Sequence, residues 1–185
     1  MEKENLKIIT AVFFTLVAVV GMPVHAKPFS NSFSGATSAS EEANTSGDLT
    51  PGSISQSRSK GSFGTALQSG RSDLIDWDQF TFCDSGAGPF AGVELVYHSS
   101  SIVASYDKRG DQLYAVMSAS PVSTLCVNLA NSVSSVFEIH YDVIGGTGRF
   151  EGATGQYSIE GTATVVQNGH SGFTGISSGD ITLIK

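Results

Sequence analysis

The chain has 185 residues and a formal net charge of −7, with 10 Lys and Arg side chains against 17 Asp and Glu. Nucleic-acid binding depends on clustered cations that neutralise phosphates, so this composition argues against a nucleic-acid partner. The same shortage of cations argues against attachment to an anionic lipid surface by charge.

The first 26 residues have the pattern of a secretory signal peptide. Lys3 and Lys7 precede an apolar run over residues 8–20, and Val24 and Ala26 occupy the small-residue positions that signal peptidase reads. The apolar run is shorter than the roughly 20 residues that a membrane-spanning helix needs. We therefore expect cleavage after Ala26, no membrane span after cleavage, and a secreted or periplasmic location. An uncleaved anchor is the alternative.

The next segment, residues 27–72, is dominated by serine, glycine and threonine, and its few apolar residues show no lasting period. Such a segment buries too little surface to offset chain entropy, which predicts a disordered leader. Residues 73–185 form a block of roughly 110 residues, which is enough for one domain with one core. The expected order is a signal peptide (residues 1–26), a disordered Ser/Gly-rich leader and one folded domain.

Strand signals follow one another through residues 73–185, and helix signals are nearly absent. Short segments alternate polar and apolar residues with a period of two and are separated by Gly, Ser, Asp and Asn. The expected strand segments are residues 73–82, 92–98, 101–107, 112–120, 122–130, 135–144 and 155–166, followed by 171–175 and 179–185. About eight strands at hairpin spacing predict an all-β, antiparallel domain. Closure removes the sheet edges, so a single eight-stranded β-barrel is the leading fold, with a β-sandwich as the alternative.

The most glycine-rich stretch, residues 145–155, is a candidate phosphate-binding loop. A dinucleotide fingerprint beginning at Gly146 would need a third glycine where Glu151 stands, and the closing Gly-Lys-Ser/Thr of a P-loop is absent. Both motifs also need a following helix, whereas the alternation here predicts a strand. We interpret the stretch as a turn between strands, in which the Arg149 charge has no essential role. The structural turn residues are Gly145, Gly146, Gly148, Phe150, Gly152 and Gly155.

The residues around this turn resemble a family pattern. An aromatic and an aliphatic residue precede Gly-Gly-Thr-Gly-x-Phe, and a small residue then precedes a further glycine. This pattern is similar to that of the allene oxide cyclase-like and dirigent-like, calycin-like β-barrels, especially their small secreted bacterial members. The matching residues are Tyr141, Val143, Gly145, Gly146, Thr147, Gly148, Phe150, Ala153 and Gly155. The resemblance covers residues 133–164 in detail and implies an eight-stranded barrel with an apolar cavity open at one end.

The resemblance does not extend to an activity, because the motif marks a turn. The plant enzymes of this group use the cavity to direct cyclisation or coupling of a reactive intermediate. Their acidic or polar catalytic residues have no match in this sequence, so the catalytic residues stay unknown and we leave open whether the protein is an enzyme.

Candidate ligand-binding residues are aromatic side chains expected on the inner face of the barrel. Tyr97 and Tyr141 lie nearest to that face, and Trp77 and Tyr114 are weaker candidates. A tyrosine hydroxyl in an apolar pocket can orient a ligand through one hydrogen bond. The leading function is therefore the binding of a small apolar ligand inside the barrel, or else a structural role in the envelope.

Two other functions stay open. The first is a cyclase or isomerase that acts by shape control, which a buried carboxylate such as Glu94 or Asp78 would favour because burial raises the pKa of a carboxyl. The second is a protein-binding or inhibitor module, which an exposed apolar patch would favour. No cofactor and no metal site are expected, and the oligomeric state is not defined by the sequence.

One polar trio could form a metal or acid–base site. Glu138, His140 and Asp142 lie on one face of the strand predicted for residues 135–144. The opposite face of that strand is apolar and belongs inside, so we expect the trio to meet solvent.

The two cysteines, Cys83 and Cys126, form an even pair in a chain that is predicted to be exported. Such a pair predicts a disulfide, with two buried free thiols as the alternative.

Overall fold

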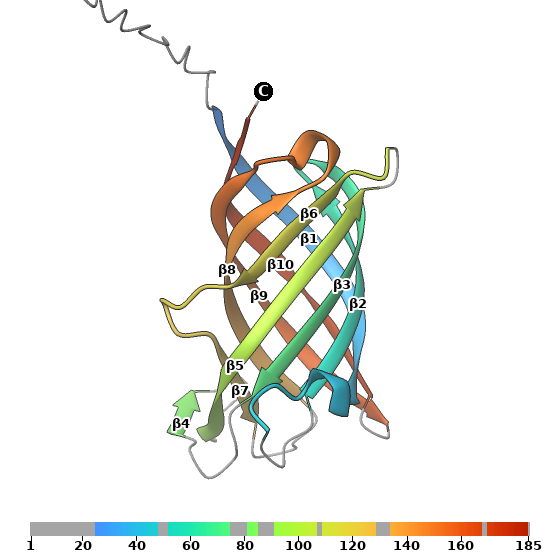
Figure 1. The fold of residues 1–185 in the computed structure, drawn as a ribbon. Helices are drawn as coiled ribbons and strands as arrows, with labels where there is room; N and C mark the ends of the chain where they lie inside the picture. The colour runs from blue at the N-terminus through green and yellow to red at the C-terminus, as the bar shows by residue number, and fades with distance from the viewer. Residues whose placement is uncertain are drawn as a thin grey trace, which may run out of the picture.

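The computed structural model describes residues 25–47, 52–74, 81–84, 91–106, 109–128, 134–167 and 170–184. These residues form a closed, antiparallel, eight-stranded β-barrel with two extra strands (Figure 1). The predicted all-β barrel is therefore confirmed, and the chain does not form a β-sandwich. Within the described ranges, no helix is long and apolar enough to cross a membrane.

The strand order explains how ten labelled strands occupy eight positions. The strands are β1 (His25–Ser40), β2 (Gly52–Gly61), β3 (Gly64–Leu74), β4 (Thr81–Asp84), β5 (Ala91–Tyr106), β6 (Gln112–Met117), β7 (Thr124–Asn128), β8 (Ser134–Gly146), β9 (Thr154–Gln167) and β10 (His170–Leu183). Neighbours around the barrel follow the order β3-β2-β1-β10-β9-β8-β6-β5, and pairing of β3 with β5 closes it. Strands β6 and β7 share one position between β5 and β8, while β4 continues the position of β3 along β5. The described residues also include the 3-10 helices η1 (Glu41–Ala43) and η3 (Gly148–Phe150).

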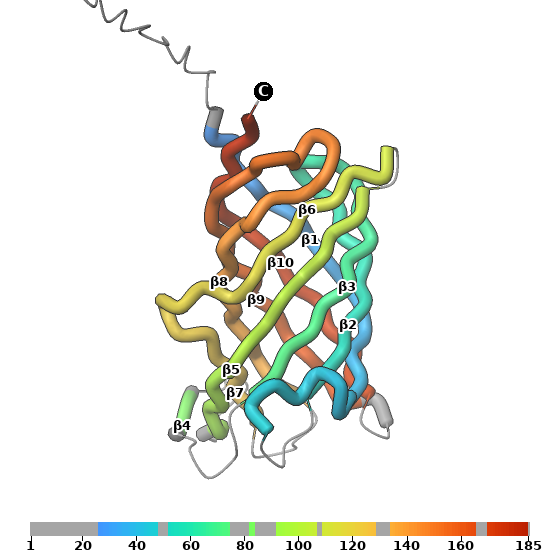
Figure 2. The backbone as a smooth tube through the Cα atoms, in the orientation of Figure 1, coloured from blue at the N-terminus to red at the C-terminus, as the bar shows by residue number. Residues whose placement is uncertain are grey.

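Three of the barrel strands lie in the segment that was expected to be a disordered leader. Strand β1 pairs with β10 on one side and β2 on the other, and β2 in turn pairs with β3 (Figure 2). The disordered leader predicted for residues 27–72 is therefore wrong. Its strands show little apolar periodicity because the inward residues of β2 are hydroxyl side chains, namely Ser53, Ser55, Ser57 and Ser59. Strand β2 therefore lacks a buried apolar face, and ladder hydrogen bonds to β1 and β3 hold it in the barrel.

Some predicted strands were divided at the wrong residues. Residues 92–98 and 101–107 belong mainly to the single strand β5, and residues 171–175 and most of 179–185 belong to the single strand β10. In β5, Asp73 of β3 pairs with Ser99 and Leu74 pairs with Tyr97, which leaves His98 as the extra residue of a β-bulge. The bulge changes which alternate side chains face inward. The predicted strand at residues 73–82 is not one strand either, because β3 ends at Leu74, β4 begins at Thr81, and residues 75–80 lie outside the described residues.

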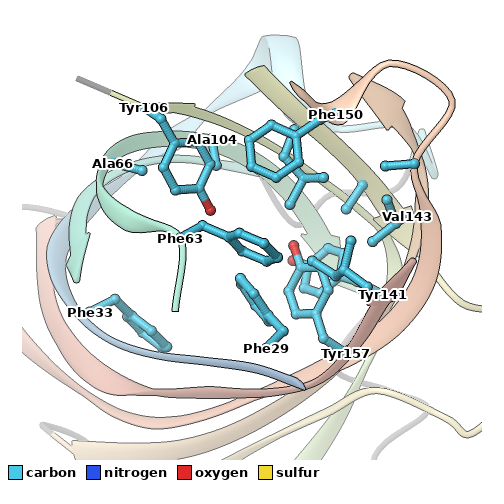
Figure 3. Close-up of a cluster of buried hydrophobic side chains, with 14 of the residues drawn as sticks. Phe29, Phe33, Phe63, Ala66, Ala104, Tyr106, Tyr141, Val143, Phe150 and Tyr157 are labelled. Carbon is cyan, nitrogen blue, oxygen red and sulfur yellow. The ribbon is translucent and has the colours of Figure 1, made fainter. Parts of the chain in front are cut away.

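An aromatic plug fills one end of the barrel, which we call the closed end. Its members are Phe29, Phe63, Tyr106, Phe150 and Tyr157, all buried. The Phe150 ring centroid lies 5.0 Å from that of Tyr106 and 5.4 Å from that of Phe63, and the rings converge on the barrel axis (Figure 3). Rings at these separations gain edge and stacking contacts as well as burial.

The glycine-rich stretch connects β8 to β9 at the closed end. Strand β8 ends at Gly146, η3 carries Phe150 into the plug, and β9 begins at Thr154. Gly148 has a φ of +59°, a conformation that disfavours other residues. Gly146 is needed for a different reason, because a Cβ there would overlap the Gln112 carbonyl oxygen of β6.

Arg149 covers the plug from outside. Its Nη2 donates to the Phe63 carbonyl oxygen at 2.9 Å, and its Nε lies 3.4 Å from Asp111 Oδ2. Its guanidinium carbon is also 4.8 Å from the ring centroids of both Tyr106 and Phe150. A cation over aromatic rings stabilises their packing, so the Arg149 charge contacts the plug in a way that the turn interpretation did not include.

The predicted disulfide between Cys83 and Cys126 is confirmed, with Cα atoms 6.2 Å apart. It joins β4 to β7 across the outer face of β5, directly over Gly92. A Cβ at Gly92 would lie 2.7 Å from the Cys126 sulfur and 3.0 Å from the Cys83 sulfur, so the bridge needs glycine beneath it. Disulfides persist in oxidising compartments, which agrees with an extracellular location; the signal peptide itself lies almost wholly outside the described residues.

Candidate functional site

The half of the barrel opposite the plug contains a cavity of about 280 Å³. It lies at the end where β1 runs into η1 and where β9 turns back into β10, which we call the cavity end. Two chemically different walls enclose it, and each wall comes from a different part of the strand order.

The apolar wall comes from β8, β9, β10 and β1. It includes Phe33, Phe137, Ile139, Ile159, Ala163 and Phe173. Phe137, Gly161, Gly175 and Phe33 form one continuous row of cross-strand partners. A Cβ at Gly161 would lie 2.6 Å from Cζ of Phe137, and one at Gly175 would lie 2.6 Å from Cζ of Phe33. The two glycines therefore give the phenylalanine rings room to lie flat against the wall.

The polar wall comes mainly from β2 and β3 and is rich in hydroxyl groups. Its members include Ser53, Ser55, Ser57, Gln68 and Ser72. The Ser57 hydroxyl donates to Gln68 Oε1 at 2.9 Å, and the hydroxyls of Ser53 and Ser72 are 2.8 Å apart. These groups carry no charge, so this wall offers hydrogen bonds without an electrostatic preference for an ion.

Two of the predicted ligand-binding residues, Tyr97 and Tyr141, both line the cavity. The Tyr141 hydroxyl lies 2.6 Å from the Ser100 hydroxyl, which fixes the tyrosine head at the junction of the two walls. Burial raises the pKa of Tyr141, and burial together with the nearby Tyr141 raises the pKa of Tyr97. Both phenols therefore stay protonated and neutral at physiological pH.

The other predicted site residues that the structure describes do not line the cavity. Tyr114 alternates with the buried Leu113 and Ala115, so it lies on the outer face, where its hydroxyl donates to Gln112 Oε1 at 2.7 Å. Glu94 pairs with Cys126 on the outer face of β5 and does not line the cavity. Trp77 and Asp78 lie outside the described residues.

The sequence reasoning missed the polar wall and the part of the apolar wall that β1 supplies, because both lie in the segment assigned to a leader. One signal could have revealed the polar wall. Ser53, Ser55, Ser57 and Ser59 recur with a period of two, which is the period of a strand even though the residues are hydrophilic.

The described residues that line the cavity include no aspartate, glutamate, histidine or lysine. Arg71 is the one charged residue among them, and it is exposed at the outer face of β3. The trio Glu138, His140 and Asp142 lies on the outer face of β8, as expected, where His140 Nε2 is 3.1 Å from Glu138 Oε1. Within the described ranges, no three side chains of the metal-ligating kind are clustered.

One buried carboxylate lies behind the cavity wall. Asp73 is 1% exposed, and its Oδ2 accepts hydrogen bonds from the backbone nitrogens of Thr45 and Ser46 at 2.6 and 2.7 Å. It accepts a third from the Thr45 hydroxyl at 2.9 Å. These bonds attach the segment after η1 to the end of β3, next to the cavity end.

Asp73 gives the protein a defined acid sensitivity. Burial alone would raise the pKa of Asp73, but the hydrogen bonds from Ser46 and Thr45 outweigh burial and hold the pKa below its usual value. A lowered pKa in the folded state contributes stability that is fully present above the unfolded pKa, about 3.9, and is lost as the pH falls through the folded pKa. We expect Asp73→Asn to cost about 1.5–3 kcal/mol at pH 7 and progressively less as the pH falls below about 4.

Urea unfolding of both proteins at pH 7, 5 and 3 measures this difference. Asp180→Asn, which changes an exposed carboxylate on β10, is the matched control and should cost little at any pH. An Asp73→Asn penalty that is the same at pH 3 as at pH 7 would contradict the assignment.

No family model, no curated protein and no solved structure matches this chain. Of the fold that the sequence resemblance implied, the structure shows the eight-stranded antiparallel barrel.

Proposed function

We propose that this protein binds a small, uncharged, mainly apolar molecule inside its barrel. The observation that carries the proposal is the unequal filling of the interior: aromatic side chains plug the closed end, while a cavity of about 280 Å³ is left at the other. That volume is close to the lower end of the range of ligand pockets, which is about 300–1,000 Å³.

The composition of the walls supports an uncharged ligand with a polar edge. The flat phenylalanine rings of the apolar wall suit a planar or cyclic apolar face. The serines of β2 and β3 suit hydroxyl or carbonyl groups along the opposite edge. An ionised ligand would lose its hydration inside this cavity without gaining an opposite charge.

Two alternatives receive less support. A purely structural barrel gains stability when its interior is filled, because a residual cavity destabilises a core in proportion to its volume. An isomerase or cyclase that uses acid–base chemistry would need a titratable group beside the ligand. Apart from the exposed Arg71, the titratable groups among the described lining residues are the phenols of Tyr97, Tyr141 and Tyr157, and burial raises the pKa of all three.

Filling the cavity tests the proposal. Prodan, a neutral dye whose emission shifts to the blue in apolar surroundings, should bind the wild type with one site. Ala163→Trp adds an indole inside the cavity and should weaken prodan binding at least tenfold. Thr164→Trp adds the same indole to the exposed outer face of β9 and should leave binding unchanged.

A thermal melt of each variant shows whether Ala163→Trp disturbs folding. If it does, Ala163→Leu, which fills less of the cavity, replaces it in the binding test. The proposal fails if the wild type does not bind prodan. It also fails if the inward and outward tryptophans have equal effects on binding.

A further inference from the structure

A second group of polar side chains lies deeper in the barrel than the cavity. Asn31, Ser59, Tyr106 and Ser177 are all at most 4% exposed. Both amide atoms of Asn31 and the hydroxyl of each of the other three lack a hydrogen-bond partner among the described residues. We call these four residues the inner polar cluster.

Strand pairing brings the four residues together on the inner face. Asn31 of β1 and Ser177 of β10 are direct cross-strand partners. Ser59 and Tyr106 both pair with Ala66, one from each side, so they flank a single small residue of β3. The Asn31 side chain also lies close enough to Tyr106 to act on the pKa of its hydroxyl, although the geometry does not complete a hydrogen bond.

The chain makes room for these polar groups. A Cβ at Gly61, the β2 partner of Asn31, would overlap Asn31 Oδ1. The Tyr106 hydroxyl points into the interior of the barrel (Figure 3). Native proteins nearly always satisfy buried polar groups, and leaving one unpaired costs free energy that an apolar side chain would not. Four such residues on one part of the inner face therefore need hydrogen-bond partners that the described residues do not supply.

The inner polar cluster adjoins the inner end of the cavity. Ser177 pairs with Ile159 and Ser59 pairs with Phe33, and both of those partners line the cavity. The four residues do not line the cavity themselves, so a molecule reaches the cluster when its inner end extends past Phe33 and Ile159 toward the plug.

The cluster is suited to a neutral group. Its side chains are an amide and three hydroxyls, which both donate and accept hydrogen bonds. The cation Arg149 lies over the Tyr106 ring, but it is already bonded to the Phe63 carbonyl and paired with Asp111. Burial raises the pKa of Tyr106, and this effect outweighs the smaller lowering by Arg149 and by the Asn31 side chain, so this phenol stays neutral as well.

We infer that the inner polar cluster binds the polar end of the cavity's ligand, and that this end is an uncharged group such as a hydroxyl or a carboxamide. The inference rests on the proposed function and adds to it the orientation of the ligand, with its hydrogen-bonding end toward the plug and its apolar body along the phenylalanine wall.

A matched pair of probes tests this orientation. Biphenyl-4-ol and biphenyl differ by one hydroxyl, and each is measured by its displacement of prodan. The wild type should bind biphenyl-4-ol about tenfold more tightly than biphenyl, as one buried hydrogen bond allows. Ser177→Ala should remove most of that preference while the affinity for biphenyl stays the same. Ser178→Ala, on the exposed face of β10, should leave both affinities unchanged.

The free protein supplies a second readout. Ser177→Ala removes a hydroxyl that has no partner, so its melting temperature without ligand should equal or exceed that of the wild type, and Ser59→Ala should behave likewise. Equal affinities for the two probes in the wild type, or a preference that persists in Ser177→Ala, would mean that the cluster holds water only and would overturn the inference. Failure of prodan itself to bind would instead overturn the proposed function.

Discussion

Phe150→Ala is expected to lower the free energy of unfolding by about 3–5 kcal/mol, the cost of deleting a fully buried aromatic ring. Phe150 is 0% exposed, and its ring contacts Tyr106 and Phe63 at the centre of the aromatic plug. Removing it also takes away the ring surface on which the Arg149 guanidinium rests. Urea unfolding followed by near-ultraviolet circular dichroism measures the loss.

Phe82→Ala is the matched control for this prediction. Phe82 is 71% exposed on β4, so the same deletion of a ring should cost less than about 1 kcal/mol. Similar losses for the two variants would show that the plug contributes no more to stability than an exposed side chain does.

Removing the disulfide should have an effect of comparable size. The bridge joins residues that are 43 positions apart, and the chain-entropy model gives about 4 kcal/mol for closing a loop of this length. The double variant Cys83→Ala/Cys126→Ala should therefore lose most of this stability, because its unfolded chain is less constrained.

A reductant provides the control in the same experiment. The urea midpoint of the wild type should fall toward that of the double variant when the reductant is added, whereas the midpoint of the double variant should not move. If the double variant unfolds at the same urea concentration as the oxidised wild type, the bridge does not stabilise the fold.

The barrel could be predicted from the strands that alternate cleanly. Strand β8 is the clearest case, since Phe137, Ile139, Tyr141 and Val143 alternate with polar residues and all face inward. The predicted segment, residues 135–144, lies within the observed strand. Strand β2 shows why other parts failed, because its inward residues are serines that meet a cavity and a polar cluster and not an apolar core. Hydrophobic periodicity cannot identify a strand whose buried face is polar.

The candidate site could be predicted only in part, for a related reason. Tyr97 and Tyr141 were predicted on the inner face because each shares one face of its strand with apolar residues, and both line the cavity. The change of face within β5 depends on the bulge at His98, which is set by pairing with β3 and leaves no local pattern. The cavity itself depends on the glycines at positions 161 and 175, where the absence of a side chain matters only once the strands lie next to Phe137 and Phe33.

The pairing of β1 with β10 sets the order in which this protein can assemble as it leaves the ribosome. Every strand between them emerges before β10 does, so β1 keeps one unpaired edge while the nascent chain grows. During that interval Phe29 and Phe33 also lack the partners on β9 and β10 that cover them in the finished barrel. An unpaired strand edge next to exposed aromatic rings favours aggregation, and contacts between distant parts of a chain form slowly. The barrel therefore stays open, with an edge that is prone to aggregation, until β10 pairs with β1.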